Sequence, residues 1–338
     1  MNRFCLLIVL GTTLLALLSC EPELGERNLE EGVCWYADRS LHMVGKISAE
    51  GDRVLLRYTD LVEPVAVACV PFDGSVWIAD VGAQELVRLS LDGDVMRRVA
   101  GFASPIALAV DPLEEVLWVI DTANNSISRV GPRGTHLSTY YGLQNPLAVS
   151  VDRDTGEAWV ADGNAGLVRI ASDGISAQRF GGLGYVNDVS VDVYERRLYI
   201  ADPKNNKVTC LRPTGEILWV FTGVEGSPLL EPTKVQAAPE GTVWVIDRYL
   251  DEGVYRYRIQ RIGSAGLTII SGPGYTQNTA FNFEPVCLAM RWSRDEVWVG
   301  DLERHRVYQC AKDGAALDWV SGLGQPVSVS VYESVLDR

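Results

Sequence analysis

The stretch "EAWVAD" (157–162) joins an aromatic residue, small or apolar neighbours and a final aspartate, and the chain writes this pattern seven times. The other copies are "VCWYAD" (33–38), "SVWIAD" (75–80), "VLWVID" (116–121), "RLYIAD" (197–202), "TVWVID" (242–247) and "EVWVGD" (296–301). Aromatic and β-branched residues favour strands. Each copy therefore predicts a short strand that ends at its aspartate.

The aspartates mark a longer repeat. A proline or its equivalent opens each unit fifteen or sixteen residues earlier, at Pro64, Pro105, Pro146, Val186, Pro232 and Pro285. A glycine turn usually follows the aspartate by about thirteen residues, so the period is close to 41 residues. "PLAVSVD" and "GLVRIAS" alternate as half-buried strands do, and "SDG" predicts a tight turn. Four short strands in a unit of this length are typical of a propeller blade.

The two ends of the repeat predict how the ring closes. The chain from residue 33 starts directly with a second strand, while "PVSVSVYESVLDR" (326–338) supplies one more first strand. We therefore predict an all-β fold, a seven-bladed β-propeller of four-stranded antiparallel blades, in which the C-terminal strand completes the N-terminal blade. The count favours seven blades over six or eight, and residues 33–338 form one domain.

The units resemble a known repeat. "PIALAVDPLEEVLWVIDTANNSISRVGPRG" (105–134) and "PLAVSVDRDTGEAWVADGNAGLVRIASDG" (146–174) are similar to NHL repeats. This resemblance covers the chain from about residue 33 and implies a β-propeller that binds proteins, peptides or other ligands. The aspartate motif also resembles the Tyr-Trp-Thr-Asp propellers of receptor ectodomains, but the proline-led first strand favours the NHL type.

The first residues form a separate region. "MNRFCLLIVLGTTLLALLSC" (1–20) has a basic start, an apolar run and a small residue before Cys20, which is typical of an export signal. Its end resembles a bacterial lipobox, so we expect a signal peptide at 1–19 and lipidation of Cys20. An ordinary signal with a chance cysteine is the alternative. The acidic segment 20–32 would tether the propeller to a membrane of the bacterial cell envelope, facing the periplasm or the exterior.

The charge and the cysteines narrow the partners. The formal net charge is −14, and it becomes −15 when Arg3 leaves with the signal. Such a surface repels phosphate backbones, so we expect no nucleic-acid partner. We expect a monomeric propeller attached to the membrane through its lipid alone. Five cysteines remain in the propeller, without metal-site spacing, and a disulfide among them stays open: Cys34, Cys69, Cys210, Cys287 and Cys310.

Seven aspartates could be a ring of ligands or seven uses of one structural device. A carboxylate at a strand end can accept hydrogen bonds from the backbone amides of the adjoining loop. Because every unit has this aspartate, we favour the structural role.

Function in repeat proteins lies where the repeat is broken. The segments 223–231, 248–258 and 272–284 are longer than their counterparts, and all three fall on one face around the fifth to seventh blades. They carry aromatic residues suited to contact surfaces, although the loops could instead cover one another. The candidate binding residues are Tyr249, Tyr255, Tyr257, Tyr275, Phe281 and Phe283.

The innermost strands give a second set of candidates. Most units place small residues toward the axis, but Asp188, Lys234 and Gln236 break this rule in two neighbouring blades. Asp188 and Lys234 could pair with each other, or the three residues could line a ligand pocket at the mouth of the channel.

"YVNDVSVD" (185–192) resembles a segment of gluconolactonase-like propellers, in which the asparagine binds a divalent metal. This resemblance implies metal candidates at Asn187 and Asp188. Glu63, Glu231 and Glu284 precede their opening prolines and could add oxygen ligands for Ca²⁺ or a similar ion.

Three functions follow from these features. We expect a membrane-anchored, extracytoplasmic binding propeller that recognises a protein, peptide or carbohydrate on the enlarged-loop face, with no catalytic residues and no cofactor. A divalent-metal-dependent hydrolase or lyase is the alternative. A structural envelope component without a discrete ligand is the third.

Overall fold

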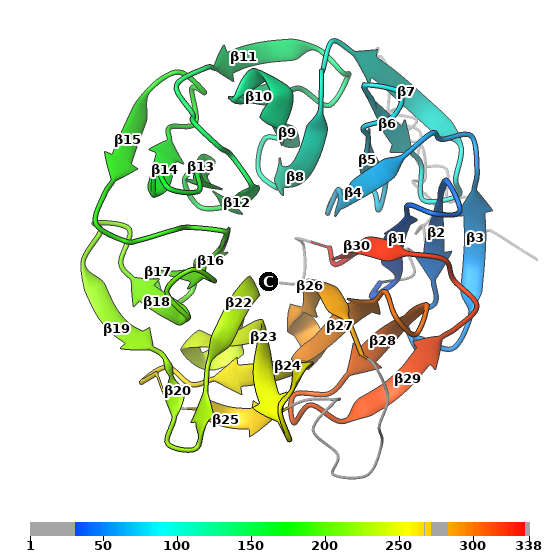
Figure 1. Cartoon of the computed structure of the whole chain (residues 1–338). Coiled ribbons are helices and arrows are strands. Elements are labelled where there is room, and N and C mark those ends of the chain that lie inside the picture. The colour runs from blue at the N-terminus through cyan, green and yellow to red at the C-terminus, as the bar shows by residue number, and fades with distance from the viewer. Residues whose placement is uncertain (1–30, 267, 272–282, 335–338) are drawn as a thin grey trace, which may run out of the picture.

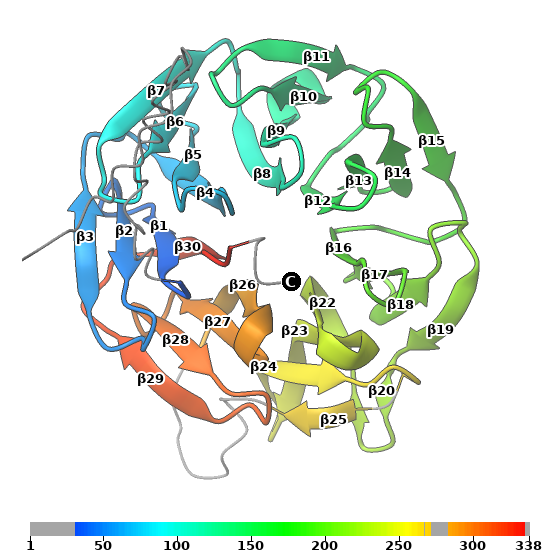
Figure 2. The same cartoon turned by 180° about the vertical axis from the view of Figure 1, so that it is seen from behind.

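The computed structural model describes residues 31–266, 268–271 and 283–334. Seven four-stranded antiparallel sheets surround a central channel, as Figures 1 and 2 show from opposite sides. The predicted seven-bladed β-propeller is therefore confirmed. No helix of this described part is long and apolar enough to cross a membrane.

The first four blades are regular. The four strands of each blade follow one another from the channel outward, and the innermost strand is named first. The first blade contains β30 (Pro326–Val331), β1 (Cys34–Asp38), β2 (Met43–Ile47) and β3 (Val54–Tyr58); the second contains β4 (Pro64–Cys69), β5 (Val76–Asp80), β6 (Glu85–Leu89) and β7 (Val95–Ala100); the third contains β8 (Pro105–Asp111), β9 (Val116–Asp121), β10 (Ser126–Val130) and β11 (His136–Tyr140); the fourth contains β12 (Ala148–Asp152), β13 (Glu157–Ala161), β14 (Leu167–Ile170) and β15 (Ala177–Phe180).

The sixth blade departs from this regularity, because it has longer strands and a small hairpin before it. Three short 3₁₀ helices complete the secondary structure: η1 (Thr122–Asn124), η2 (Pro239–Gly241) and η3 (Trp292–Arg294). The fifth blade contains β16 (Asp188–Asp192), β17 (Arg197–Asp202), β18 (Lys207–Leu211) and β19 (Ile217–Phe221); the hairpin contains β20 (Gly223–Val224) and β21 (Ser227–Pro228); the sixth blade contains β22 (Leu230–Ala238), β23 (Thr242–Asp251), β24 (Val254–Ile262) and β25 (Thr268–Ser271); the seventh contains β26 (Pro285–Arg291), β27 (Glu296–Asp301), β28 (Arg306–Cys310) and β29 (Ala316–Val320).

The ring closes as the sequence predicted. β30 pairs antiparallel with β1, with Cys34 opposite Val331 and Ala37 opposite Ser328. The last strand of the chain is therefore the innermost strand of the first blade, which joins both ends of the described chain in one sheet.

The aromatic residue of each motif belongs to the core between blades. Trp35, Trp77, Trp118, Trp159, Tyr199, Trp244 and Trp298 are all fully buried. In five blades a cation on the third strand lies over the indole, at 5.4–5.8 Å from the ring centroid. Arg88 then donates to the Pro132 carbonyl of the next blade (2.8 Å), and Lys46 donates to the Leu91 carbonyl in the same way (2.7 Å). All five cations therefore cover the aromatic core, and Lys46 and Arg88 also connect neighbouring blades.

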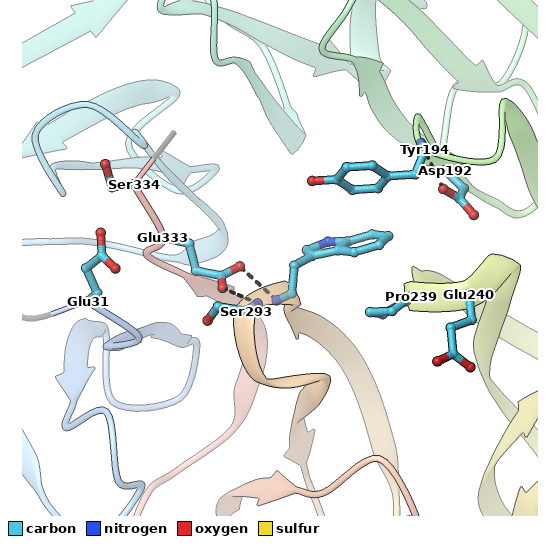
Figure 3. A pocket seen from close by; sticks show the side chains of 9 residues that line it. Glu31, Asp192, Tyr194, Pro239, Glu240, Ser293, Glu333 and Ser334 are labelled. Atoms are coloured by element: carbon cyan, nitrogen blue, oxygen red, sulfur yellow. Dashed lines mark hydrogen bonds between the residues drawn. The ribbon is translucent and has the colours of Figure 1, made fainter. Parts of the chain in front are cut away.

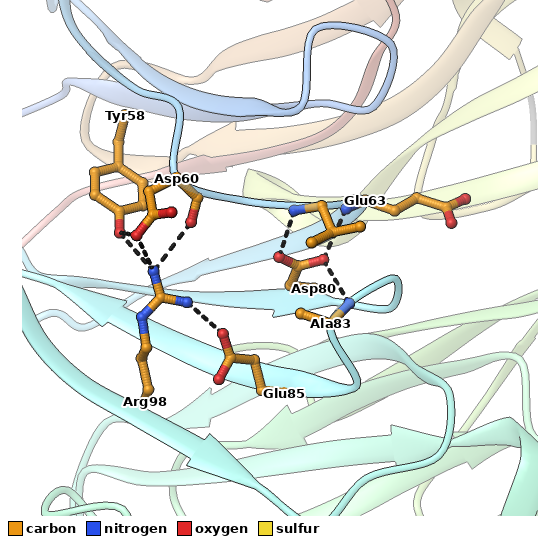
Figure 4. Close-up of polar contacts among 8 residues, drawn as sticks. Tyr58, Asp60, Glu63, Asp80, Ala83, Glu85 and Arg98 are labelled. Carbon is orange, nitrogen blue, oxygen red and sulfur yellow. Dashed lines mark hydrogen bonds and ion pairs between the residues drawn. The ribbon is translucent and has the colours of Figure 1, made fainter.

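The motif aspartates fasten the chain where it enters each blade. Figure 4 shows the second blade, in which the Asp80 carboxylate accepts the amides of Val62 (2.8 Å), Glu63 (2.7 Å) and Ala83 (3.2 Å). The predicted structural role is confirmed in this blade. The carboxylate also holds the connection that arrives from the preceding blade, which the sequence did not predict.

The same device recurs around the ring. Asp38, Asp121, Asp162, Asp202 and Asp301 each accept at least one amide of the arriving connection. Beside Asp80, Arg98 of β7 binds Tyr58 (2.9 Å), Asp60 (2.6 Å) and Glu85, so a second polar cluster ties the first blade to the second (Figure 4).

The five cysteines of the propeller are buried free thiols in the structure. Burial raises the pKa of Cys69, Cys210, Cys287 and Cys310 to about 12. They are packing residues of low reactivity.

The meander gives the propeller two distinct faces. The second strands end at their aspartates on one face, which also carries the connections between blades, and we call it the aspartate face. The first strand of each blade turns into the second on the opposite face, which we call the turn face.

Candidate functional site

The enlarged segment of the sixth blade forms a two-stranded ribbon on the aspartate face. β23 and β24 continue past the Asp247–Arg258 pair to Asp251 and Val254. Leu250 and Tyr255 lie opposite each other in this register and are 56% and 65% exposed, and Val254 is 55% exposed. The tip of the ribbon therefore presents apolar side chains to solvent.

Asp247, the motif aspartate at the base of the ribbon, differs from the others in its hydrogen-bond partners. Asp247 is bound by side chains, with the Arg258 guanidinium at 2.8 and 2.9 Å and the Gln260 amide at 2.8 Å. Arg258 also donates to Ser227 (2.5 Å) and to the Pro228 carbonyl (2.9 Å) in the β20–β21 hairpin. Both insertions are thus anchored on one buried guanidinium.

A second cluster braces the side of the ribbon. Arg248 donates to the Tyr257 hydroxyl and to Glu231 (2.6 Å). The hydrogen bond to Tyr257, together with the negative charges of Glu231 and Glu284, raises the pKa of Arg248. Tyr249 lies under the Arg258 guanidinium, 5.5 Å from it. Of the three predicted ribbon tyrosines, Tyr255 is therefore the outward one, while Tyr249 and Tyr257 contact the arginines of the base.

The other aromatic candidates are placed differently. Phe283 is 6% exposed and packs edge-on against Tyr308, at 6.1 Å between ring centroids. Its ring belongs to the core between the sixth and seventh blades. Tyr275 and Phe281 lie outside the described residues, as does Cys20.

The polar candidates near the axis hold the fifth blade to the sixth. Asp188 accepts the Val235 amide of β22 (2.9 Å) and lies 3.8 Å from the Lys234 ammonium. Ser190 accepts the Ala237 amide (2.9 Å) in the same manner. Gln236 lines the channel, whose volume is about 430 Å³. The pairing of Asp188 with Lys234 is therefore present, and the carboxylate also satisfies an edge amide of the next inner strand.

Four of the candidate metal ligands bind other protein groups through their side chains: Glu63, Asn187, Asp188 and Glu231. Asn187 donates its side-chain amide to the Thr233 carbonyl (2.9 Å), and Glu231 binds Arg248. The Glu284 amide is held by Asp301. Across the described ranges, no group of three or more His, Cys, Asp or Glu side chains is arranged to hold a metal ion.

The turn face carries a cavity that the sequence did not predict. It has a volume of about 320 Å³ and lies between the turns of the fifth, sixth and seventh blades and the segments that flank the first blade. Trp292 lines both this cavity and the channel, so the cavity lies at the channel's end on this face. Figure 3 shows its acidic and aromatic walls, which include Asp192, Tyr194, Glu240 and Glu333.

Substitutions in the turns between first and second strands build this cavity. Asp192 ends β16, and its Oδ1 accepts the Tyr194 and Glu195 amides, both at 3.1 Å. In the seventh blade Arg291 replaces this aspartate. Glu333, which follows the last strand, caps that turn instead through the amides of Trp292 (2.8 Å) and Ser293 (2.7 Å). The aromatic residues at 194 and 292 were the available sequence signal, together with a turn in the sixth blade (239–241) that is one residue shorter than those at 193–196 and 292–295.

The fold and its surfaces define the chain as a seven-bladed β-propeller with a braced ribbon on one face and a cavity on the other. No protein-family profile matches the chain, and no curated protein matches it.

Solved structures share the fold. A chain of Kuenenia stuttgartiensis hydrazine synthase aligns with a TM-score of 0.68 at 16% identity, over 80% of this chain and 90% of that one. Virginiamycin B lyase from Staphylococcus aureus aligns with a TM-score of 0.62 at 17% identity, over 76% and 84%. A functionally unknown protein from Desulfotomaculum acetoxidans aligns with a TM-score of 0.68 at 13% identity, over 90% and 100%. At these identities the likeness concerns the fold alone.

Proposed function

We propose that this protein is a lipid-anchored, extracytoplasmic binding propeller of the NHL type and that it recognises a protein partner with the ribbon of the sixth blade. The observation that carries the proposal is the exposed apolar tip, Leu250, Val254 and Tyr255, on a base fixed by Arg258. A projecting apolar edge suits the surface of another protein better than a sugar, which binding sites usually enclose. The rigid base lowers the entropy lost when the ribbon docks.

Photo-crosslinking tests the ribbon directly. A photoreactive phenylalanine analogue in place of Val254 should give one discrete adduct in intact cells, identified by mass spectrometry. The same analogue in place of Tyr141 is the matched control, because Tyr141 is 71% exposed on the same face but lies in a connection of the third blade. Leu250→Ser and Tyr255→Ser should reduce the adduct from position 254. Equal adducts from both positions would remove the ribbon from the proposal.

The anchor is tested separately. Cys20→Ser should abolish the incorporation of a labelled fatty acid into the protein, since Cys20 is the residue that carries the lipid in this proposal. Incorporation of the fatty acid after this change would contradict lipid anchoring at Cys20 and leave the ribbon experiment unaffected.

A further inference from the structure

The cavity on the turn face has the composition of a cation site. Tyr194 and Trp292 form an aromatic pair in its wall, with ring centroids 5.3 Å apart and planes tilted by 48°. The Arg153 guanidinium already lies over the Tyr194 ring, 4.6 Å from its centroid. The lining itself contains four carboxylates and no Lys, Arg or His. Aromatic faces and carboxylates both attract organic cations.

One oxygen of these carboxylates lacks a hydrogen-bond partner. Asp192 is 1% exposed, and its Oδ2 accepts no hydrogen bond from any described residue. Buried carboxylate oxygens are normally satisfied, so an orphan oxygen on a residue that borders a cavity indicates a donor supplied from outside.

The neighbouring interface shows what is missing. Between the fourth and fifth blades, Asp152 holds the place of Asp192 and receives the guanidinium of Arg196 from the next turn, at 3.1 Å. Between the fifth and sixth blades the place of Arg196 is taken by Gly241, beside Glu240. The turn of the sixth blade therefore supplies no cation here. The Arg197 guanidinium of the fifth blade lies against Gly241 instead, beside Glu240.

The carboxylates occupy two ends of the cavity. Figure 3 shows Glu31 and Glu333 on one side and Asp192 and Glu240 on the other, with the Tyr194 ring and Pro239 reaching between them. A single metal ion needs several oxygens on one centre, which this separation does not offer. A chain with a positive charge at each end and an apolar middle matches the arrangement.

We propose that the turn-face cavity binds a small aliphatic diamine or polyamine, with one ammonium group at Asp192 and Glu240, another at Glu31 and Glu333, and the methylene chain over Tyr194 and Trp292. This site is independent of the ribbon on the aspartate face.

Calorimetric titration of the whole propeller tests this site with three probes that share a five-carbon chain. 1,5-Diaminopentane should bind at least about fivefold more tightly than 1-aminopentane, and 1,5-pentanediol should not bind. Glu240→Gln and Tyr194→Ala should each weaken diamine binding at least about fivefold. Both side chains are exposed, so the variants should fold.

The third blade provides matched controls on the same turn. Leu113 occupies the place of Tyr194, since its amide is likewise held by Asp111 (2.9 Å). Glu114 corresponds to Glu240, since each lies two residues before the second strand of its blade. Leu113→Ala and Glu114→Gln should leave diamine binding unchanged.

Three results would overturn the proposal. Equal losses in the control variants would mean diffuse attraction to an acidic protein. Equal affinity for the monoamine would remove the two-ended site. A capped dilysine peptide that binds more tightly than the diamine would assign the cavity to a peptide.

Discussion

The two ends of β16 carry the same residue in opposite situations. Asp188 faces the channel near the aspartate face, where the Val235 amide and Lys234 satisfy it. Asp192 faces the cavity on the turn face, where one oxygen caps the turn and the other has no partner among the described residues. Both are buried, at 7% and 1% exposure. Burial of an acid therefore does not mark a binding site by itself; the number of unsatisfied oxygens distinguishes the two ends.

The largest expected effect on stability comes from removing the Asp188 carboxylate, whose hydrogen-bonding capacity is satisfied. Asp188→Ala leaves the Val235 amide without its acceptor, although Val235 is only 4% exposed, and it removes the carboxylate beside Lys234. We expect a loss of about 2–3 kcal/mol in the free energy of unfolding, measured by urea denaturation.

The first blade supplies the control for this change. At the corresponding position Ser328 accepts the Val67 amide at 3.2 Å. Asp188→Ser should therefore lose only about 1 kcal/mol. If the serine variant is as unstable as the alanine variant, the Lys234 pair and not the edge amide carries the stability.

The next prediction tests the roles of the two Asp192 oxygens separately. Asp192→Ala removes both turn bonds and should cost about 1 kcal/mol, whereas Asp192→Asn keeps an oxygen for the Tyr194 and Glu195 amides and should cost at most about 0.5 kcal/mol. The asparagine variant should still lose diamine binding, because its charge is gone. Unfolding and titration on the same samples measure both quantities, and an asparagine variant with full affinity would show that Oδ2 takes no part.

The sequence predicted the ring better than its sites, for a physical reason. A motif such as "SVWIAD" recurs because every blade needs a core aromatic residue and a carboxylate for the incoming amides, so repetition itself reported the fold. Insertions were visible as changes of spacing, which located the ribbon but not the inward packing of Phe283. The cavity depends on single replacements, Arg291 for an aspartate and Gly241 at the place of Arg196, whose meaning appears only when neighbouring blades face each other.

The smallest effect is the pH dependence at Asp192. Burial raises the pKa of Asp192 above its ordinary value of 3.8, and the Glu195 carboxylate adds to the shift, while the turn amides and Arg197 oppose it. Tyr199 and Cys210 also face this group from β17 and β18, and both stay uncharged over the acidic range because burial raises each pKa.

The direction in which stability changes with pH follows from the raised pKa of Asp192 in the folded state. Native Asp192 holds its proton more tightly than the unfolded chain does, so its contribution to stability is complete below pH 3.8 and is lost as the pH rises through the folded pKa. The stability of the wild type relative to Asp192→Asn should therefore decrease as the pH rises from 3.8 to the pKa of Asp192 in the folded protein. Diamine affinity should change in the opposite direction, weakening on acidification as the carboxylate takes up its proton. Unfolding curves and titrations in steps from pH 3.5 to 7 test both trends together, and a diamine affinity that stays constant over this range would place the ammonium group away from Asp192.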